Sequence, residues 1–335
     1  MKEFIVDIIG IGKTVGSVKQ PNSLVAKNLN ISEKEIIEKS GIKNRYIAGN
    51  ESATDMAICA LNEAIVDAKI SKKQLEGIIV CTFSGDYLFP SEATRICKYL
   101  KINPSFAYDI KANCAGFQVG LSNGRDILLA NDKYKYIAIV ALTKQSPFIN
   151  KYDLNSAYYF GDAASAVVLE KMKGRETGVL SSYHEISSAN HELVRLRTGG
   201  SSFPFSKESL KEENSSSLYF EHMGLGVWKE VIVKLPQIIN NALNDLNWKI
   251  DDISLFLMHQ ANMNLINYIV KKLKIPSNKT MTNVQDIGNT GDASVGTILY
   301  DAKKSGLLKK NSKIILASVG AGFVYAVTPY IVFSE

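Results

Sequence analysis

The chain has 335 residues, of which 46% are hydrophobic and 21% charged, and its formal net charge is +6. This length can bury a large core in one big domain or in two fused ones, and the composition is typical of a soluble globular enzyme. Because the basic residues are spread along the chain without an Arg-rich arm, we expect no nucleic-acid partner, while a local basic patch for an acidic partner stays open.

The N-terminal segment, residues 1–12, holds a short apolar run interrupted by Asp7, which predicts a first strand and not a signal peptide. No apolar stretch approaches the roughly 20 residues that a membrane-spanning helix needs, so we expect no membrane contact. The four cysteines form no C-x-x-C pair, which argues against a disulfide framework and a structural zinc site. This use of cysteine fits the reducing cytoplasm best. The chain has only four histidines and no cluster at ligand spacing, so we expect no metal site.

The chain repeats one order of elements: an amphipathic helix, an apolar strand, a second helix and another apolar strand. In the first half we place these elements at residues 54–68, 75–81, 114–128 and 134–143. In the second half we place them at 227–246, 252–258, 291–305 and 311–320, and the last three match the first half at an offset of 177 positions.

This repeat predicts two homologous α/β halves, 1–172 and 173–335, related by a pseudo-twofold axis. Continuous apolar strands suit sheets that are covered on both faces. We therefore expect five layers (αβαβα), with helices buried between two sheets. Residues 185–217 break the pattern, and we interpret them as a loop insertion that is either a lid or a tolerated surface excursion.

Cys114 lies between small residues, after one predicted strand and at the start of a predicted helix. The positive end of a helix favours a thiolate over a thiol, so this position suits a reactive nucleophile, although a lone cysteine is more often a small buried hydrophobe. His259 follows an apolar strand of the second half, and Asn289 lies in the loop before the helix that matches the one at Cys114. If the halves pack about a pseudo-twofold axis, these three residues meet.

The motifs at these positions give the chain a family resemblance. They are Asn113–Phe117 (NCAGF), Phe160–Ala166 (FGDAASA), His259–Asn262 (HQAN), Gly288–Thr290 (GNT), Gly320–Phe323 (GAGF) and Ser40–Arg45 (SGIKNR). Over nearly its whole length the chain resembles the β-ketoacyl-acyl carrier protein synthase III family of thiolase-fold condensing enzymes. The resemblance implies a thiolase-like fold, a homodimer and no cofactor beyond acyl-coenzyme A or acyl-carrier protein as substrates.

Carried over residue by residue, the resemblance makes Cys114 the acylated nucleophile and His259 and Asn289 the pair that handles the second substrate. The backbone N–H groups of Cys114 and Ala321 would form the oxyanion hole. A malonyl thioester, carried by acyl carrier protein, would then lose CO2 and attack the acyl-enzyme to give a β-ketoacyl thioester. The alternative is a non-condensing acyltransferase that passes the acyl group from Cys114 to an alcohol or amine.

Three further readings fit less well. A type III polyketide synthase usually carries a Gly-Phe-Gly-Pro-Gly turn, whereas this chain has Gly-Ala-Gly-Phe. A thiolase uses a second cysteine near its C-terminus, and none follows Cys114 here. A non-catalytic scaffold on the same fold would not need three intact site residues.

The resemblance also suggests binding residues. Phe89 would line the acyl pocket across the dimer interface, and Asn262 and Lys39 would contact substrate. Lys229, Lys271 and Lys272 match the family's basic rim for the acidic acyl carrier protein, which they would steer. The alternative interpretations assign these residues no binding role: Phe89 would pack within its loop, and the lysines would form a solvated helix face.

The match fails where the family commonly uses a Trp and an Arg to sandwich the adenine of coenzyme A. Those positions are Glu35 and Leu154 here, and Val319 replaces an aromatic-like wall near the nucleophile. An acidic group repels phosphate, and leucine cannot form a planar cation stack. We therefore expect an acyl-carrier-protein donor or an unusual acyl group, in a specialised pathway.

Overall fold

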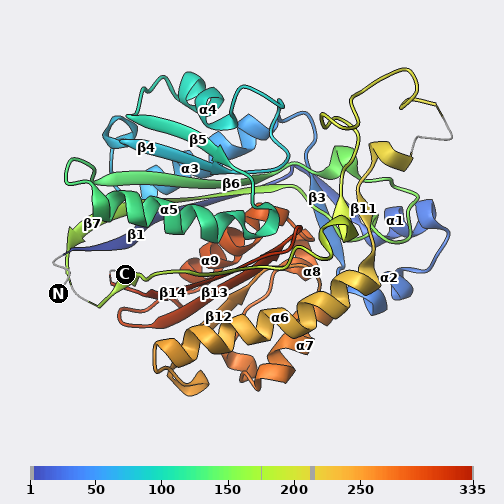
Figure 1. Ribbon diagram of the computed structural model, residues 1–335. Helices are drawn as coiled ribbons and strands as arrows, with labels where there is room; N and C mark the ends of the chain where they lie inside the picture. The colour runs from blue at the N-terminus through green and yellow to red at the C-terminus, as the bar shows by residue number, and fades with distance from the viewer. Residues whose placement is uncertain (1–3, 175, 212–215, 334–335) are drawn as a thin grey trace.

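The computed structural model describes residues 4–174, 176–211 and 216–333. Two mixed sheets dominate this part of the chain (Figure 1). The first has the order β1 (Phe4–Val15), β7 (Ala163–Lys173), β6 (Tyr136–Thr143), β4 (Gly77–Cys81), β5 (Phe106–Ile110). The second has the order β12 (Leu255–Met258), β13 (Lys313–Gly320), β14 (Val324–Ile331), β8 (Gly178–Val179), with β9 (Tyr183–Ile186) also paired to β14.

Helices cover both faces of both sheets, which confirms the predicted five layers (Figure 1). The outer face of the first sheet packs against α3 (Ala53–Asp67) and α4 (Glu92–Leu100). The outer face of the second sheet packs against α6 (Gly224–Asp245) and α7 (Met263–Leu273). Between the sheets lie α5 (Gly116–Ala130) and α9 (Ser294–Lys304), whose apolar side chains join one buried cluster with both inner faces.

The two sheets share one core pattern. In the first, β4 runs parallel to β6, and β6 runs antiparallel to β7. In the second, β12 runs parallel to β13, and β13 runs antiparallel to β14. Every residue of β4 and β12 is buried, as expected for parallel strands that are covered on both faces.

The predicted offset between the halves is wrong by one residue for two of the three elements. Helices α5 and α9 begin at Gly116 and Ser294, 178 positions apart, and β4 and β12 begin 178 apart as well. Only β6 and β13 keep the offset of 177. The second half is therefore one residue shorter between its central helix and the next strand, and Cys114 corresponds to Asp292 and not to Gly291.

Smaller elements close one end of the molecule (Figure 1). They are β2 (Val18–Pro21), α1 (Asn22–Leu29), α2 (Glu33–Ser40), β3 (Asn44–Ile47) and α8 (Val284–Ile287). Short 3-10 helices occur at η1 (Lys72–Gln74), η2 (Asn113–Ala115), η3 (Ser146–Phe148), η4 (His191–Leu193), η6 (Ile250–Asp252), η7 (Ser277–Lys279) and η8 (Gly291–Ala293).

The segment predicted as a loop from 185 to 217 is not all irregular. Its first two residues belong to β9, which extends the second sheet, and β10 (Val194–Arg195) pairs with β11 (Glu221–His222) just beyond its end. Residues 212–215 lie outside the described part of the chain. The predicted boundary at 172/173 falls at the end of β7 and stays a prediction.

Within the described residues, no helix is long and apolar enough to cross a membrane. The same residues hold no group of three His, Cys, Asp or Glu side chains placed to bind a metal ion.

Candidate active site

Cys114 sits in the turn η2, between the end of β5 and the start of α5. Asn113 has a φ of 50°, which bends the chain sharply into the turn. The end of β13 presses against it: a Cβ atom on Gly320 would lie 2.4 Å from the oxygen of Ala112 and 3.1 Å from the nitrogen of Cys114. The Asn113 Nδ2 also donates a hydrogen bond to the oxygen of Ala321 at 2.8 Å. The nucleophile turn and the Gly320–Phe323 turn are therefore one packed unit.

The electrostatic surroundings of Cys114 correct one expectation from the sequence. Burial raises the pKa of the Cys114 thiol above its ordinary value, and the charge of Asp292 raises it further. Desolvation disfavours the charged form of a buried group, and here it outweighs the favourable helix dipole. Burial and the charge of Asp292 therefore favour the thiol form of Cys114, whereas the helix N-terminus by itself favours the thiolate.

His259 directly follows β12 and is fixed at both its backbone and its ring. Its N–H donates to the oxygen of Ala317 in β13 at 2.8 Å. Its Nδ1 lies 2.6 Å from the hydroxyl oxygen of Ser294, the first residue of α9. Burial lowers the pKa of His259 to about 4, so the imidazole is neutral at physiological pH. If the Ser294 hydroxyl donates to Nδ1, then Nε2 carries the proton and is the donor.

Asn289 is held by its backbone and by one side-chain oxygen. Its N–H donates to the oxygen of Tyr159 at 2.8 Å, and its carbonyl accepts from Gly161 N and Gln145 Nε2 at 2.9 and 2.8 Å. Its Oδ1 accepts from the N–H of Gly291 at 3.0 Å. Because that oxygen is engaged, Nδ2 is the group that Asn289 can offer to a ligand as a hydrogen-bond donor.

The Phe160–Ala166 motif supports this arrangement through Asp162. The buried Asp162 carboxylate accepts from the N–H groups of Gln145, Ser146 and Ala48 at 2.8, 2.9 and 2.8 Å, and from the Ser146 hydroxyl. Gln145, held in this way, reaches Asn289. The motif therefore acts as a frame that places the Asn289 backbone.

The turn that carries Cys114 contacts the turn that follows Asn289, and His259 contacts the helix that continues this second turn. The turn η2 packs against η8, which begins two residues after Asn289, and against β13. The Ser294 that touches His259 starts the helix that continues η8. Residues far apart in the sequence are thus gathered at the N-terminal ends of α5 and α9, between the two sheets.

Phe89 lies outside this centre. Its side chain is 84% exposed, and the neighbouring Leu88 and Tyr87 are 83% and 58% exposed. Three consecutive large apolar side chains are therefore exposed to solvent at the tip of this loop, and such exposed apolar patches often mark interaction sites. Phe89 therefore cannot line the pocket of its own chain as a buried wall.

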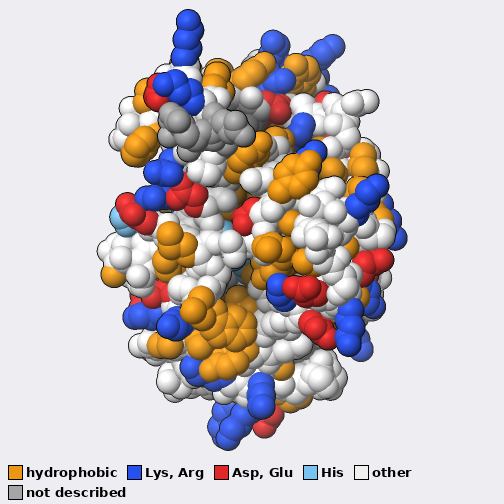
Figure 2. Space-filling view, turned by 90° about the vertical axis from the view of Figure 1, so that its right-hand side faces the viewer, with side chains coloured by type: hydrophobic (Ala, Val, Ile, Leu, Met, Phe, Trp, Pro, Cys, Tyr) orange, Lys and Arg blue, Asp and Glu red, His pale blue; other side chains and the backbone are white. Residues whose placement is uncertain are grey.

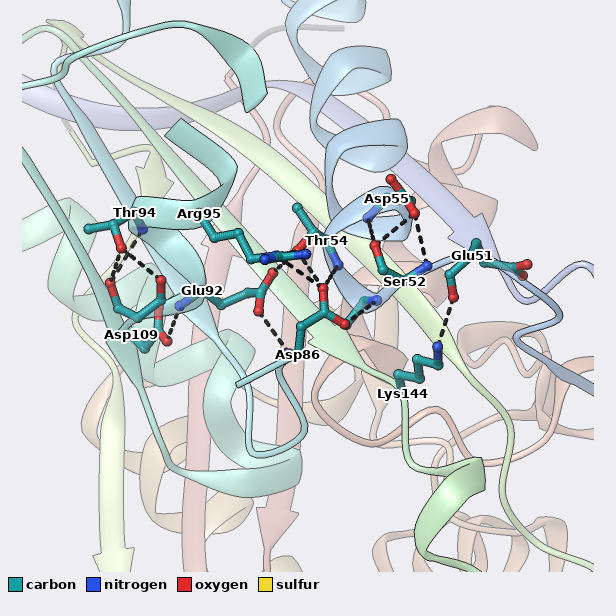
Figure 3. Close-up of polar contacts among 12 residues, drawn as sticks. Glu51, Ser52, Thr54, Asp55, Asp86, Glu92, Thr94, Arg95, Asp109 and Lys144 are labelled. Atoms are coloured by element: carbon teal, nitrogen blue, oxygen red, sulfur yellow. Dashed lines mark hydrogen bonds and ion pairs between the residues drawn. The ribbon is translucent and has the colours of Figure 1, made fainter. Parts of the chain in front are cut away.

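The base of this loop is held by a polar network (Figure 3). Asp86 accepts from the N–H groups of Ala53 and Thr54 at 2.9 and 3.1 Å, and lies 3.3 Å from the Arg95 Nε. Glu92 accepts from the N–H of Asp86 at 2.9 Å and from the Thr54 hydroxyl. The tip is exposed, but its base is fixed at the N-terminus of α3.

The other predicted substrate contacts have local partners. The Oδ1 of Asn262 caps α7 by accepting a hydrogen bond from Leu265 N at 2.8 Å. The Nδ2 of Asn262 is therefore the side-chain atom that remains to donate to a substrate. The Nζ of Lys39 lies 2.7 Å from the carboxylate of Glu35. The positive charge of Lys39 is therefore partly neutralised. Val319 is buried, and Leu154 is 47% exposed.

The predicted docking lysines lie on two neighbouring helices. Lys229 is exposed on α6, and Lys271 and Lys272 are exposed in the last turn of α7. The rings of Trp228 and Tyr268 pack 5.5 Å apart and join the two helices beside these lysines. The face around α1, α2 and β11 has hydrophobic side chains near its middle and basic side chains mostly toward its edges (Figure 2).

Sequence reasoning missed Ser294 and Asp292. The correct offset of 178 would have aligned Asp292 with Cys114, but low identity between the halves hid that single residue. Nothing in the sequence marks Ser294, since its contact with His259 joins residues 35 apart.

Comparisons with known proteins show the family of this chain. The family model for 3-oxoacyl-acyl carrier protein synthase III matches residues 108–187, and the model for the C-terminal part of 3-oxoacyl-acyl carrier protein synthase III matches residues 243–330. A β-ketoacyl-acyl carrier protein synthase III of Ehrlichia ruminantium is 32% identical over 96% of this chain and 97% of its own length.

Solved structures share the fold. A 3-oxoacyl-acyl carrier protein synthase III from Aquifex aeolicus has a TM-score of 0.86 and 28% identity, covering 97% of this chain and 99% of its own. The one from Pseudomonas aeruginosa has a TM-score of 0.88 and 23% identity, with 98% and 99% covered.

Proposed function

Because the chain belongs to the 3-oxoacyl-acyl carrier protein synthase III family, we propose that it is a β-ketoacyl-acyl carrier protein synthase III that uses Cys114, His259 and Asn289. It transfers an acyl group to Cys114 and then condenses that group with a malonyl thioester, with loss of CO2. The observation that supports this proposal is the packing of η2, which holds Cys114, against η8, which follows Asn289 and continues into the helix whose Ser294 contacts His259.

In the first half-reaction the Cys114 sulfur attacks the carbonyl of an acyl thioester, and the carrier leaves as its thiol. The N–H groups of Cys114 and Ala321 stabilise the tetrahedral oxyanion. Support comes from the close packing of Gly320 on Cys114 N and from the hydrogen bond between Asn113 and Ala321 O, which hold both amides in one rigid unit.

In the second half-reaction the thioester carbonyl of the malonyl group becomes enolate-like as CO2 departs. The Nε2–H of His259 and the Nδ2 of Asn289 donate hydrogen bonds to that oxygen. A neutral imidazole is suited to this, because it donates without holding a full positive charge that would retain the carboxylate. The resulting carbanion attacks acyl-Cys114 and forms the β-ketoacyl thioester.

The donor of the first acyl group is an acyl-carrier protein in this proposal. The ion pair of Glu35 with Lys39 offers little attraction to the phosphates of coenzyme A, and Leu154 provides no stacking cation. Lys229, Lys271 and Lys272 bind the acidic carrier beside the aromatic pair Trp228 and Tyr268. The enzyme works in the cytoplasm with its thioester substrates and without a resident cofactor.

The enzyme is a homodimer in this proposal, with Phe89 reaching the acyl pocket of the partner subunit. An apolar tip of three exposed side chains on a rigid base is suited to insertion into a second copy of the chain. Light scattering of the wild type and of Phe89→Asp tests this. The variant is expected to dissociate or to lose its acyl-chain preference.

Intact-protein mass spectrometry after exposure to acyl-carrier proteins and acyl-coenzyme A thioesters, followed by malonyl-acyl carrier protein, tests the function. We expect an adduct at Cys114 that disappears as CO2 and a β-ketoacyl thioester form. An adduct that passes only to alcohols or amines, without CO2, would establish the acyltransferase alternative instead.

A further inference from the structure

A cavity lies at the C-terminal end of α9, away from the candidate active site. Its volume is about 370 Å³. The helix begins at Ser294, which contacts His259, whereas Lys303, near its last residue, lines the cavity. At a rise of about 1.5 Å per residue, the helix separates Ser294 from Lys303 by about 14 Å. The described residues that line the cavity include none of the candidate active-site residues, so the cavity is a separate space.

The floor of the cavity is apolar and comes from both sheets and the helix between them. It is formed by Ile8 of β1, Leu299 of α9, Tyr330 of β14 and Val332, which follows β14. All four residues are buried. The Tyr330 hydroxyl, the one polar group on these side chains, already donates to Asp7 Oδ1 at 2.9 Å. A bound water needs two or more polar partners, so this floor suits an aliphatic group better than water.

The turn after α9 forms the rim of the cavity. Gly306 has a φ of 68°, and its N–H donates to the oxygen of Lys303 at 3.0 Å, which ends the helix with a left-handed glycine. A Cβ atom on Gly306 would meet no other atom within 4 Å, so the space beside this residue is open. The chain then continues to Leu308 and Lys309, which also line the cavity.

The rim carries positive charge. The segment 303–310 (KKSGLLKK) holds four lysines and no acidic residue. The Nζ of Lys303 lies 2.7 Å from Oδ2 of Asp67, so its charge is balanced. Lys309 is exposed, and its Nζ has neither a hydrogen bond nor an ion pair in the part of the chain that the structure describes. The cavity therefore combines an apolar floor with an ammonium group at its rim that is free to meet an anion.

We propose that this cavity binds an aliphatic carboxylate, a fatty acid of medium chain length, with the alkyl chain on the floor and the carboxylate at Lys309. Burial of the chain supplies most of the affinity, because an exposed ion pair contributes little. The ion pair instead fixes which end of the ligand stays at the rim. A volume of about 370 Å³ lies near the lower limit for ligand pockets and is too small to enclose coenzyme A.

Photoaffinity labelling tests the location of this site. The probe is decanoate with a diazirine group near the end of its alkyl chain, irradiated with the full chain. Peptide mass spectrometry is expected to find the label in peptides that contain Leu299, Leu308 or Val332, and an excess of plain decanoate should remove it. Label found only in other peptides, such as those with Cys114 or Phe89, would overturn the inference.

Two variants test the contacts, and the decanoate concentration that halves the cavity label measures affinity at this site alone. Leu308→Trp places a larger side chain at the rim and is expected to weaken binding at least tenfold. Lys309→Glu is expected to weaken decanoate binding about fivefold at low salt and less at high salt. Uncharged decanol should displace the label equally well from the wild type and from Lys309→Glu, because it makes no ion pair.

Lys310→Glu is the matched control, since it makes the same charge change at the next residue, which does not line the cavity. It should bind decanoate nearly as tightly as the wild type. Equal losses in Lys309→Glu and Lys310→Glu, or no loss in Lys309→Glu, would contradict a carboxylate at Lys309, and this comparison decides if Leu308→Trp does not fold. The test does not use acylation of Cys114, so its result is independent of the proposed function.

Discussion

The turns η2 and η8 show how one backbone design serves two chemical roles. Both follow a loop, both have a residue of positive φ before their second position, and both lead into a helix of the central layer. In the first turn that second position is a half-buried cysteine, and in the second it is a fully buried aspartic acid. The contact of η2 with η8 brings the N-terminal ends of α5 and α9 together. The side chains at equivalent positions of the two turns then determine what each half contributes.

The two halves also differ in the solvent exposure of the other predicted site residues that they contribute. The first half adds the loop tip at Phe89, which is solvent-exposed, and the second half adds His259 and Asn289, which are both 7% exposed. A nucleophile must meet a bulky thioester, whereas donors to a developing oxyanion work best where water is excluded. Substitutions in each half test this division, from the largest expected effect to the smallest.

Cys114→Ala removes the nucleophile of the first half. We expect no acyl adduct by intact mass and a loss of product formation on the order of 10⁴-fold or more, as when other enzymes lose a nucleophile. Cys59→Ala, at an exposed cysteine on α3, is the matched control and should load normally. An acyl adduct on Cys114→Ala would assign the chemistry to another residue.

His259→Ala and Asn289→Asp act on the second half alone. Each removes one donor to the enolate oxygen, and each should lower CO2 release from the malonyl thioester by about 10²–10³-fold. Loading of Cys114 should persist, because neither side chain serves that step. Equal losses in loading and CO2 release would contradict the division of labour between the halves.

The neutral state of His259 predicts a pH dependence of stability. Its folded pKa of about 4 lies below the ordinary 6.5, so the unfolded chain binds the proton more readily. The contribution of the neutral His259 to the free energy of unfolding is fully present above pH 6.5. It is lost as the pH falls from 6.5 through 4, by up to ~3 kcal/mol. Urea unfolding of the wild type and His259→Gln should show the wild type losing more stability over that interval. Parallel curves would mean that the imidazole is not desolvated.

Ser294→Ala tests whether the hydroxyl group orients His259. Loss of one hydrogen bond of about 1.4 kcal/mol corresponds to roughly a tenfold fall in kcat for condensation. Because the fixed tautomer is lost, the pH profile of condensation should change as well, while Cys114 loading should not. Ser318→Ala is the control, since that buried hydroxyl has no partner in the described structure. An unchanged profile in Ser294→Ala would remove Ser294 from the mechanism.

Charge reversal on α7 gives the smallest expected effect. Lys271→Glu with Lys272→Glu should raise the KM for acyl-carrier protein by about tenfold at low salt, and the difference should shrink at high salt. Lys98→Glu, an exposed lysine on α4, should leave the KM unchanged. Equal effects of both reversals would indicate a general charge effect and no docking site.

The sequence determined much of this protein, because apolar runs and helical periodicity are local properties. They gave the strands β4, β6, β12 and β13, the helices α3 and α6 to within a few residues, and the five layers. The motifs at Cys114, His259 and Asn289 identified the family. The offset of the repeat was wrong by one residue, since a one-residue difference in a loop leaves no mark on the pattern of either helix.

Only the tertiary structure decided the ionisation of the site. Burial and the charge of Asp292 raise the pKa of Cys114 and favour its thiol form, against the effect of the helix dipole. Burial also lowers the pKa of His259 to about 4, which makes the imidazole more firmly neutral than a free one. Contacts such as the one between His259 and Ser294, and the carboxyl group of Asp292 facing Gly116, join residues distant along the chain. Desolvation and charge–charge interactions depend on distances in space, and those distances exist only once the two halves have packed.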